Sequence, residues 1–320
     1  MFYCNKLVLV TGGTGLVGQH MSEELLKHGA RVRIPIHNRP LQIKHKNIET
    51  VSADLIKIQD CLRAVEGVDY VVHAAGATAG AGVSALELMP LLLTNSVLTS
   101  NVLEASWRLK VQRVLIFSSS TCYPAFEHPV KESEMWDAQP HPSYMGYGWQ
   151  RRYMEKLAEY VHNNSDTQIA IVRPTAVFGR WDNFSLKAGH VIPSLIRRAL
   201  DKENPFVVWG SGKECRDFLH ITDFARGSLA VLEKHPLCDP VNIGCGESVT
   251  IENLLRIIID ACGHSAAEIV FDSSKPTKIP YRAVSIEKAQ SLLGFKPLIT
   301  LDEGVKDTVE WYLSHKSLIL

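Results

Sequence analysis

The sequence has no excess of charge of either sign and no long apolar run. Lys and Arg number 34, Asp and Glu number 34, and the formal net charge is therefore zero. Proteins that bind nucleic acid or acidic lipid through phosphates need a net basic surface, so we expect neither partner. No apolar run reaches the roughly 18–20 residues that cross a bilayer, so we expect no membrane-spanning segment.

The sequence also lacks the spacings of disulfide frameworks and metal sites. Its seven cysteines are odd in number and widely spread, without C-x-x-C, and its thirteen histidines form no H-E-x-x-H. We therefore expect reduced thiols, a cytoplasmic protein and no bound metal. Hydrophobic residues make up 46% of the chain, which is typical of a folded globular protein and not of a disordered one.

Short apolar runs alternate with amphipathic stretches in the first half of the chain. Near-continuous apolar strands separated by helices predict a parallel sheet that is covered on both faces, an α/β doubly wound (Rossmann) fold. The expected strands are 6–10, 31–36, 48–52, 70–74, 113–117 and 168–172, and the expected helices are 17–28, 91–107 and 147–162.

The pattern changes after Pro174. Residues 180–217 are rich in Pro, Trp, Gly and charge, and they precede one short strand at 241–243 and helices at 251–262, 286–293 and 305–313. We expect a first domain of residues 1–175, with 218–244 returning to it. Residues 176–217 and 245–320 would form a smaller α/β substrate-binding domain, with a ligand in the cleft between the two.

A glycine-rich turn joins the first expected strand to the first expected helix. Gly12, Gly15 and Gly18 are spaced G-x-x-G-x-x-G, and Thr14, Leu16 and Val17 complete the turn. Glycine is needed where backbone turns tightly, touches a pyrophosphate or packs a helix on a strand, and the helix N-terminus offers N–H groups to phosphate. The strand–turn–helix context predicts dinucleotide binding by the first domain.

The ends of the next three strands supply the rest of the expected cofactor site. Asn38 and Arg39 follow the second strand, which has no carboxylate to bind a ribose 2′-hydroxyl, and an arginine can pair with a 2′-phosphate. The sequence therefore favours NADP(H), with NAD(H) as the alternative. The remaining expected contacts are Asp54 and Leu55 toward the adenine, and Ala74, Ala75 and Gly76 toward the phosphates and ribose.

A serine, a tyrosine and a cation follow the dinucleotide motif in the order that suits hydride chemistry. Ser119 ends the fifth expected strand, and Tyr147 and Arg151 share one helix face at i and i+4. A phenol beside a fixed positive charge ionises more easily and can exchange a proton with a sugar hydroxyl or carbonyl. Tyr147 as an ordinary packing residue is the alternative interpretation.

With these motifs the chain resembles the extended short-chain dehydrogenase/reductase family, which acts on nucleotide sugars. The segments that carry the resemblance, which spans essentially the whole chain, are TGGTGLVG (11–18), SSSTCYP (118–124), KESE (131–134), DNFSLKAGHVIPSLIRRAL (182–200), VVWGSGKECRDFLHITD (207–223) and VFDSSKP (270–276). It implies catalytic roles for Ser119 and Tyr147 and an acid role for His190. It further implies homodimerisation and a nucleotide-sugar site at Ser119, Ser120, His190, Val191, Arg198, Trp209 and Arg216.

Two positions depart from the family pattern. Tyr147 and Arg151 are also expected to contact the cofactor. Arg151 stands where the family has lysine; it keeps the charge and can donate to the cofactor's ribose hydroxyls, but it cannot release a proton at neutral pH. Glu155, one turn later, could pair with Arg151. Thr121 stands where members that epimerise carbon centres have a cysteine base, and a threonine hydroxyl is a far weaker base.

These residues lead to one main hypothesis and two alternatives. The main one, whose substrate is implied by the resemblance, is an NADP(H)-dependent nucleotide-sugar oxidoreductase/epimerase for a GDP-4-keto-6-deoxy-hexose, in which Tyr147 and Ser119 serve 4-keto reduction. Epimerisation at C3 and C5, with His190 as acid and Thr121 or water as base, is left open. The first alternative is a nucleotide-sugar 4-epimerase with tightly bound NAD, and the second is a dinucleotide-binding sensor or scaffold without catalysis.

Overall fold

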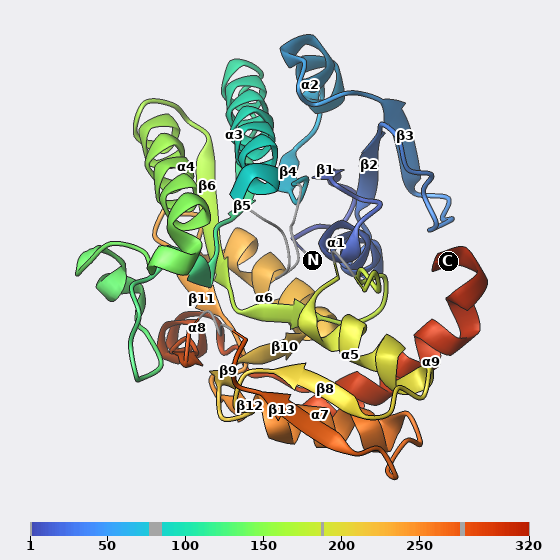
Figure 1. The fold of residues 1–320 in the computed structure, drawn as a ribbon. Helices are drawn as coiled ribbons and strands as arrows, with labels where there is room; N and C mark the ends of the chain where they lie inside the picture. Colours follow the sequence, from blue (N-terminus) through green and yellow to red (C-terminus); the bar gives the residue numbers. More distant parts are fainter. Residues whose placement is uncertain (1, 77–84, 187–188, 276–278, 320) are drawn as a thin grey trace.

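The computed structural model describes residues 2–76, 85–186, 189–275 and 279–319, and its centre is a seven-stranded sheet in the order β11-β6-β5-β4-β1-β2-β3 (Figure 1). Every neighbouring pair in this sheet is parallel. Its strands are β1 (Leu7–Thr11), β2 (Arg31–Ile36), β3 (Ile48–Ser52), β4 (Tyr70–His73), β5 (Arg113–Phe117), β6 (Gln168–Pro174) and β11 (Val241–Ile243).

Both faces of this sheet are buried under helices. Successive side chains of a strand point to opposite faces, and β1 accordingly sends Val8 and Val10 into one apolar core and Leu7 and Leu9 into another. The helices over the first core are α1 (Leu16–Lys27), α6 (Ile221–Lys234) and α8 (Glu287–Leu293), and those over the second are α2 (Ile58–Val65), α3 (Ala85–Arg108) and α4 (Met145–Asn163). The predicted doubly wound fold is confirmed.

A third apolar core lies below the sheet in the view of Figure 1. Its helices are α5 (Val191–Leu200), α7 (Ile251–Ala261) and α9 (Leu301–Ile319). Its small sheets pair β7 (Ala176–Phe178) with β10 (Phe218–His220), β8 (Phe206–Trp209) with β13 (Ile269–Asp272), and β9 (Cys215–Arg216) with both β12 (Val249–Thr250) and β14 (Tyr281–Arg282). Three short 3-10 helices, Ser120–Cys122, Glu132–Trp136 and Pro142–Tyr144, precede α4.

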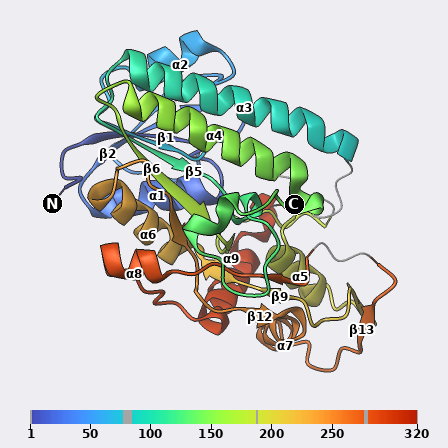
Figure 2. The same cartoon turned by 90° about the vertical axis from the view of Figure 1, so that its left-hand side faces the viewer.

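Two connections between these parts matter for the site. Strand β11 returns to the large sheet beside β6, and α8 packs on α6 and β11 although it belongs to the last third of the chain (Figure 2). Arg180, just after β7, lies 3.3 Å from Glu23 of α1 and 3.8 Å from Asp307 of α9. The smaller part is therefore fastened directly to the helix that follows the glycine turn.

The structure corrects the predicted helix lengths. The helix expected at 91–107 spans Ala85–Arg108 and continues through Pro90, although a proline inside a helix cannot donate the backbone hydrogen bond to the residue four positions earlier. The helix expected at 305–313 spans Leu301–Ile319. Among the described residues no helix is both long and apolar enough to cross a bilayer, and no cluster of side chains suits a metal ion.

A buried ion pair ties α4 to the sheet. Arg173 of β6 donates to both carboxylate oxygens of Glu155 on α4, at 2.9 and 2.7 Å, and both side chains are at most 5% exposed. Arg173 also donates to the Tyr123 hydroxyl at 2.9 Å, and Tyr123 donates to Asn242 of β11 at 2.7 Å. This network joins α4, β6, β11 and the segment after β5. The i+4 spacing had suggested that Glu155 pairs with Arg151, but Glu155 pairs with Arg173 instead.

Replacing Arg173 by methionine leaves the Glu155 carboxylate buried without its cation. We expect Arg173→Met to lower the free energy of unfolding by about 3–5 kcal/mol, measured by urea denaturation. The double variant Glu155→Met/Arg173→Met recovers most of this loss, because it buries no charge. Lys156→Met is the control: it breaks an exposed pair with Glu159 on the same helix and costs less than about 1 kcal/mol. An Arg173→Met protein as stable as the control would contradict this account.

Candidate functional site

The glycine turn leaves the N-terminus of α1 open to a phosphate. Gly12 has a φ of 67°, and a Cβ there would lie 2.6 Å from the Ala74 carbonyl oxygen. A Cβ at Gly18 would lie 2.2 Å from the Gly12 carbonyl oxygen, so neither position tolerates a side chain. The N-cap residue, Gly15, supplies no side-chain cap, and the first turn has no acidic residue. The N–H groups and the positive end of the helix dipole thus fit a pyrophosphate.

The other expected cofactor residues follow parallel strands, so they reach the same edge of the sheet. The Ala75 N–H donates to the Thr11 hydroxyl at 3.0 Å, which fixes the backbone beside the glycine turn. Thr11 also contacts His73, whose second ring nitrogen contacts Thr99. Burial, and secondly the charge of Arg151, lowers the pKa of His73 to about 3. His73 is therefore a neutral packing residue.

The adenosine end of this edge is basic. Asn38 and Arg39 are exposed in the loop after β2, and Leu55 is buried after β3. The Asp54 carboxylate accepts from the Ile56 N–H at 3.2 Å and lies 3.8 Å from Lys57. The strand end beside Arg39 carries no carboxylate, so a 2′-phosphate would meet no repulsion from residues 36–40.

Ser119 is poised to donate a hydrogen bond. Its Oγ accepts from the Thr121 N–H at 3.1 Å and from the Thr121 hydroxyl at 2.9 Å. With both acceptor positions used, the hydroxyl proton of Ser119 is left to point at another acceptor. The neighbouring Cys122 is fully buried, and this burial raises the pKa of its thiol to about 12. Neither Thr121 nor Cys122 is therefore arranged as a base.

Helix α4 lies directly on the segment that holds Ser119. Gly148 follows Tyr147, and a Cβ on it would lie 2.8 Å from the Thr121 carbonyl oxygen, so only glycine permits this contact. Arg151 donates to the Phe117 carbonyl at 2.9 Å, at the end of β5. Burial lowers the pKa of Arg151, and Tyr147 acts in the opposite direction. The structure thus brings Ser119, Tyr147 and Arg151 together at the carboxyl edge of the sheet.

The expected substrate residues fall into two groups. His190 precedes α5, its Nδ1 lies 2.7 Å from Asp182, and Val191 beside it is exposed. Arg198, at the other end of α5, forms a two-point ion pair with Glu203 and donates to the Val207 carbonyl at 2.6 Å. Its guanidinium is therefore bound within the smaller part. Trp209 ends β8 with 57% of its surface exposed.

The structure adds Arg282 to the residues found by sequence. Arg282 of β14 is the register partner of Arg216 on β9, and burial and secondly Arg282 lower the pKa of Arg216. The buried Asp217 holds this arrangement, since it accepts from the Val284 N–H at 3.4 Å and the Cys245 N–H at 2.9 Å. Two adjacent arginines supply paired positive charge, which would suit a doubly charged anion. No local motif marks Arg282, which is positioned only by strand pairing.

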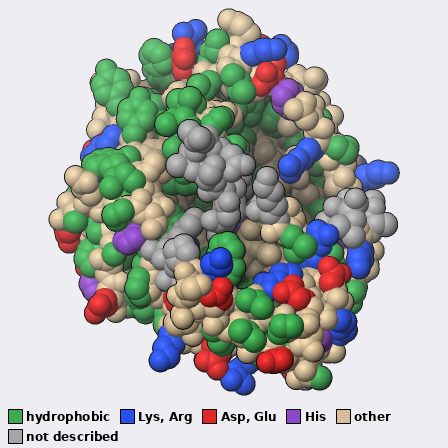
Figure 3. All heavy atoms as spheres, in the orientation of Figure 1, with side chains coloured by type: hydrophobic (Ala, Val, Ile, Leu, Met, Phe, Trp, Pro, Cys, Tyr) green, Lys and Arg blue, Asp and Glu red, His purple; other side chains and the backbone are tan. Residues whose placement is uncertain are grey.

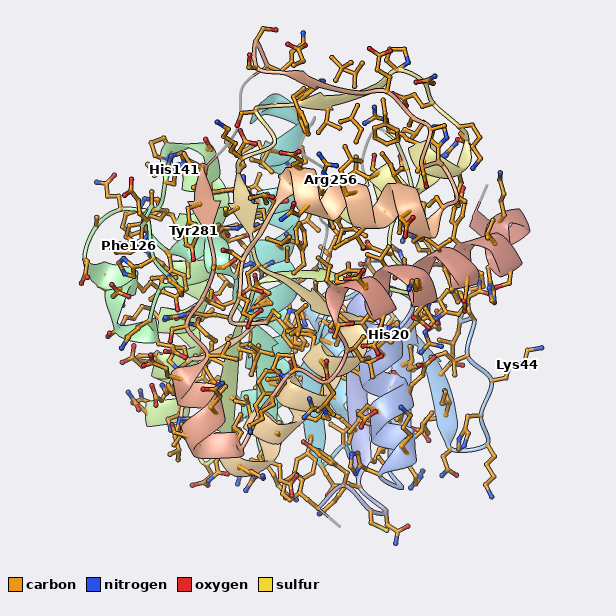
Figure 4. The ribbon with its side chains drawn as sticks, turned by 90° about the horizontal axis from the view of Figure 1, so that it is seen from below. His20, Lys44, Phe126, His141, Arg256 and Tyr281 are labelled. Atoms are coloured by element: carbon orange, nitrogen blue, oxygen red, sulfur yellow. The ribbon has the colours of Figure 1, made fainter. Side chains whose placement is uncertain are left out.

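A small pocket is lined by Arg282. Arg282 lies over the Tyr144 ring at 5.1 Å, and the pocket reaches Ser120 next to the catalytic candidate Ser119. Phe126 and Tyr281 also line it and lie on the same side of the molecule in Figure 4, whereas Lys44 projects from the loop after β2 on the opposite side. Arg282 and Ser120, the neighbour of Ser119, thus line the same pocket.

Comparison with known proteins gives a consistent result. GDP-L-fucose synthase of Escherichia coli is 29% identical over 323 residues, which cover 97% of both chains. dTDP-4-dehydro-6-deoxy-D-allose reductase of a Streptomyces species is 29% identical over 327 residues, or 98% of both chains. A solved GDP-L-fucose synthetase of Naegleria fowleri bound to NADP has a TM-score of 0.83 and 26% identity, covering 98% of this chain and 96% of that one.

The family itself is identified over most of the chain. Residues 8–244 match the NAD dependent epimerase/dehydratase family, and they include the glycine turn, Ser119, Tyr147 and Arg151. The resemblance that the motifs indicated is thereby confirmed. This chain belongs to the NAD dependent epimerase/dehydratase family.

Proposed function

We propose that this protein is an NADP(H)-dependent reductase of a nucleotide-linked 4-keto-6-deoxy sugar, with a GDP-sugar as the favoured substrate. Family membership makes the chain an NAD(P)-dependent nucleotide-sugar epimerase or reductase. The observation that carries the finer proposal is the placement of Tyr147 and Arg151 on one helix directly above the Ser119 segment. The relatives named above, which include both GDP- and dTDP-sugar enzymes, support this substrate class.

The residues of this chain supply the hydrogen bonds, the proton and the positive charge for the reaction, and the cofactor would supply the hydride. NADPH, when bound at the glycine turn, provides a hydride for the C4 carbonyl carbon. The Ser119 hydroxyl donates a hydrogen bond to the carbonyl oxygen, and Tyr147 gives that oxygen its proton. Arg151 stabilises the phenolate that remains, and because Arg151 keeps its own proton, the proton that restores Tyr147 comes from another donor. Arg216 and Arg282 would hold the diphosphate, whereas Arg198 is bound to Glu203.

We further propose that this enzyme reduces without epimerising C3 or C5. Epimerisation needs a base that removes a proton from carbon. The Thr121 hydroxyl donates its hydrogen bond to the Ser119 oxygen. The pKa of about 12 for the buried Cys122 thiol keeps that thiol protonated at neutral pH. His190 is held by Asp182 and is assigned below to substrate binding.

Tyr147→Phe removes the proton donor and keeps the ring. We expect the rate of NADPH oxidation with GDP-4-keto-6-deoxymannose to fall by about 10²–10⁴-fold, while NADPH binding, measured by fluorescence, is unchanged. Ser119→Ala lowers the rate in the same way. Tyr153→Phe, on an exposed tyrosine of the same helix, is the control with unchanged rate.

Three other outcomes would contradict the proposal. A Tyr147→Phe enzyme with the rate of the control would exclude Tyr147 as the proton donor. Purified protein that retains NAD and interconverts two nucleotide sugars would indicate the 4-epimerase alternative. Cofactor binding without turnover of any nucleotide-linked keto sugar would favour the sensor alternative.

The cofactor preference for NADP(H) depends on Arg39. Arg39→Ala removes a charge-assisted contact to the 2′-phosphate, and we expect the Kd for NADPH to rise about tenfold with no change for NADH. Arg31→Ala is the control, because Arg31 is exposed at the opposite end of β2, where it pairs with Glu49 at 3.3 Å. Equal effects on NADPH and NADH, measured by fluorescence titration, would contradict the preference.

We also propose a cytoplasmic homodimer formed through α3 and α4. These helices pack side by side, and apolar side chains gather over them (Figure 3). Met89, Leu93 and Val97 repeat along one face of α3, and Tyr160 is exposed on α4. Leu93→Glu should yield a monomer by light scattering, whereas Leu298→Glu, at an equally exposed leucine of the smaller part, should not. A dimeric Leu93→Glu protein would contradict this interface.

A further inference from the structure

Among the described residues, only Asp182 holds the His190 ring. Its Nδ1 lies 2.7 Å from a carboxylate oxygen of Asp182, and the Asp182 side chain is 1% exposed while that of His190 is 39% exposed. The two ring nitrogens lie on different edges of an imidazole. With Nδ1–H donated to Asp182, the Nε2 edge is therefore the one free to meet a ligand.

Asp182 is fixed by the loop around it. Its Oδ1 also accepts from the Asn183 N–H at 2.7 Å, and its own N–H donates to the Gly179 carbonyl at 3.3 Å. The preceding residue, Trp181, has a φ of 67°, which is costly for a side chain of this size. Its ring is held 4.8 Å from the Trp311 ring of α9. Packing on α9 thus maintains a strained turn that places Asp182 under His190.

The charge of Asp182 requires a cation. Its second oxygen, Oδ2, is buried and has no hydrogen-bond partner within the described part of the chain. A buried carboxylate without compensation is strongly unfavourable. Of the charged side chains described, only Asp182 lies within ion-pair distance of His190. On the same helix, Arg197 pairs at 3.8 Å with Asp201 and donates to the Phe184 carbonyl.

We propose that Asp182 is a positioning residue that keeps His190 as an imidazolium, whose Nε2–H donates a charged hydrogen bond to an oxygen of the nucleotide-sugar substrate. This inference rests on the proposed function. The hydrogen bond to Asp182 raises the pKa of His190, in agreement with the geometry. No proton is transferred in this role: His190 binds the substrate, and Tyr147 supplies the proton for reduction.

The pH dependence of substrate binding follows from the sign of this shift. A raised pKa means that His190 keeps its charge to a higher pH than an ordinary imidazole and loses its proton as the pH rises through that pKa. Substrate affinity is therefore lost on the alkaline side. Asp182→Asn keeps the shape and an acceptor but removes the charge, so the loss moves to lower pH.

The test compares KM and kcat for sugar reduction across pH in four proteins: the wild type, Asp182→Asn, His190→Gln and Asp201→Asn. At neutral pH we expect Asp182→Asn and His190→Gln to raise KM about tenfold or more, with little change in kcat or in NADPH affinity. The rise of KM with pH begins at lower pH in Asp182→Asn and disappears in His190→Gln. Asp201→Asn, the same change on an exposed carboxylate of α5, leaves the profile unchanged.

Titration of the His190 ring protons by NMR, without substrate, separates this inference from the proposed function. A lower His190 pKa in Asp182→Asn supports the pair even if the protein does not reduce the sugar tested, a result that would count against the proposed function alone. Equal His190 pKa values in the two proteins would overturn the pair. A lowered pKa with unchanged KM, or an effect confined to kcat, would overturn the substrate-binding role.

Discussion

The buried pair between Arg173 and Glu155 sets where α4 lies on the sheet. Because Glu155 is drawn to β6, Arg151 one turn earlier is free to donate to the end of β5. The same Arg173 holds the Tyr123 hydroxyl, and so the segment that begins at Ser119. One ion pair thus contributes to the relative positions of the serine, the tyrosine and the cation to which we assign the proposed hydride chemistry.

The central sheet could be predicted from the sequence because its strands are buried on both faces. Runs such as Leu7–Thr11 have no polar face, and they are separated by amphipathic helices. Helix α6 was not predicted, since Thr222, Asp223 and Arg226 interrupt its apolar pattern although most of the helix is buried. The short strands β9, β12 and β14 carry too few residues for any periodicity, and only their pairing defines them.

The same distinction applies to the site. The glycine turn and the Tyr147–Arg151 spacing are local, so the sequence shows them directly. The neighbour of Arg216 is not local: Arg282 reaches it through strand pairing. Spacing on a helix also suggested Arg151 as the partner of Glu155. The structure instead pairs Glu155 with the buried Arg173 of β6, whose charge has no other carboxylate partner among the described residues. The sequence also did not show Asp182 as the partner of His190, because the strained turn at Trp181 brings the two residues together.

The central claim is that Ser119, Tyr147 and Arg151 serve the reduction of a keto sugar in a site that lacks a base able to remove a proton from carbon. Proton NMR of the product formed in D₂O from NADPH and GDP-4-keto-6-deoxymannose tests it most directly, with a sample without enzyme as the control for spontaneous exchange. The account predicts a sugar reduced at C4 that keeps its original hydrogen at C3 and C5. Deuterium at C3 or C5 beyond the control, or no reduced product, would contradict it.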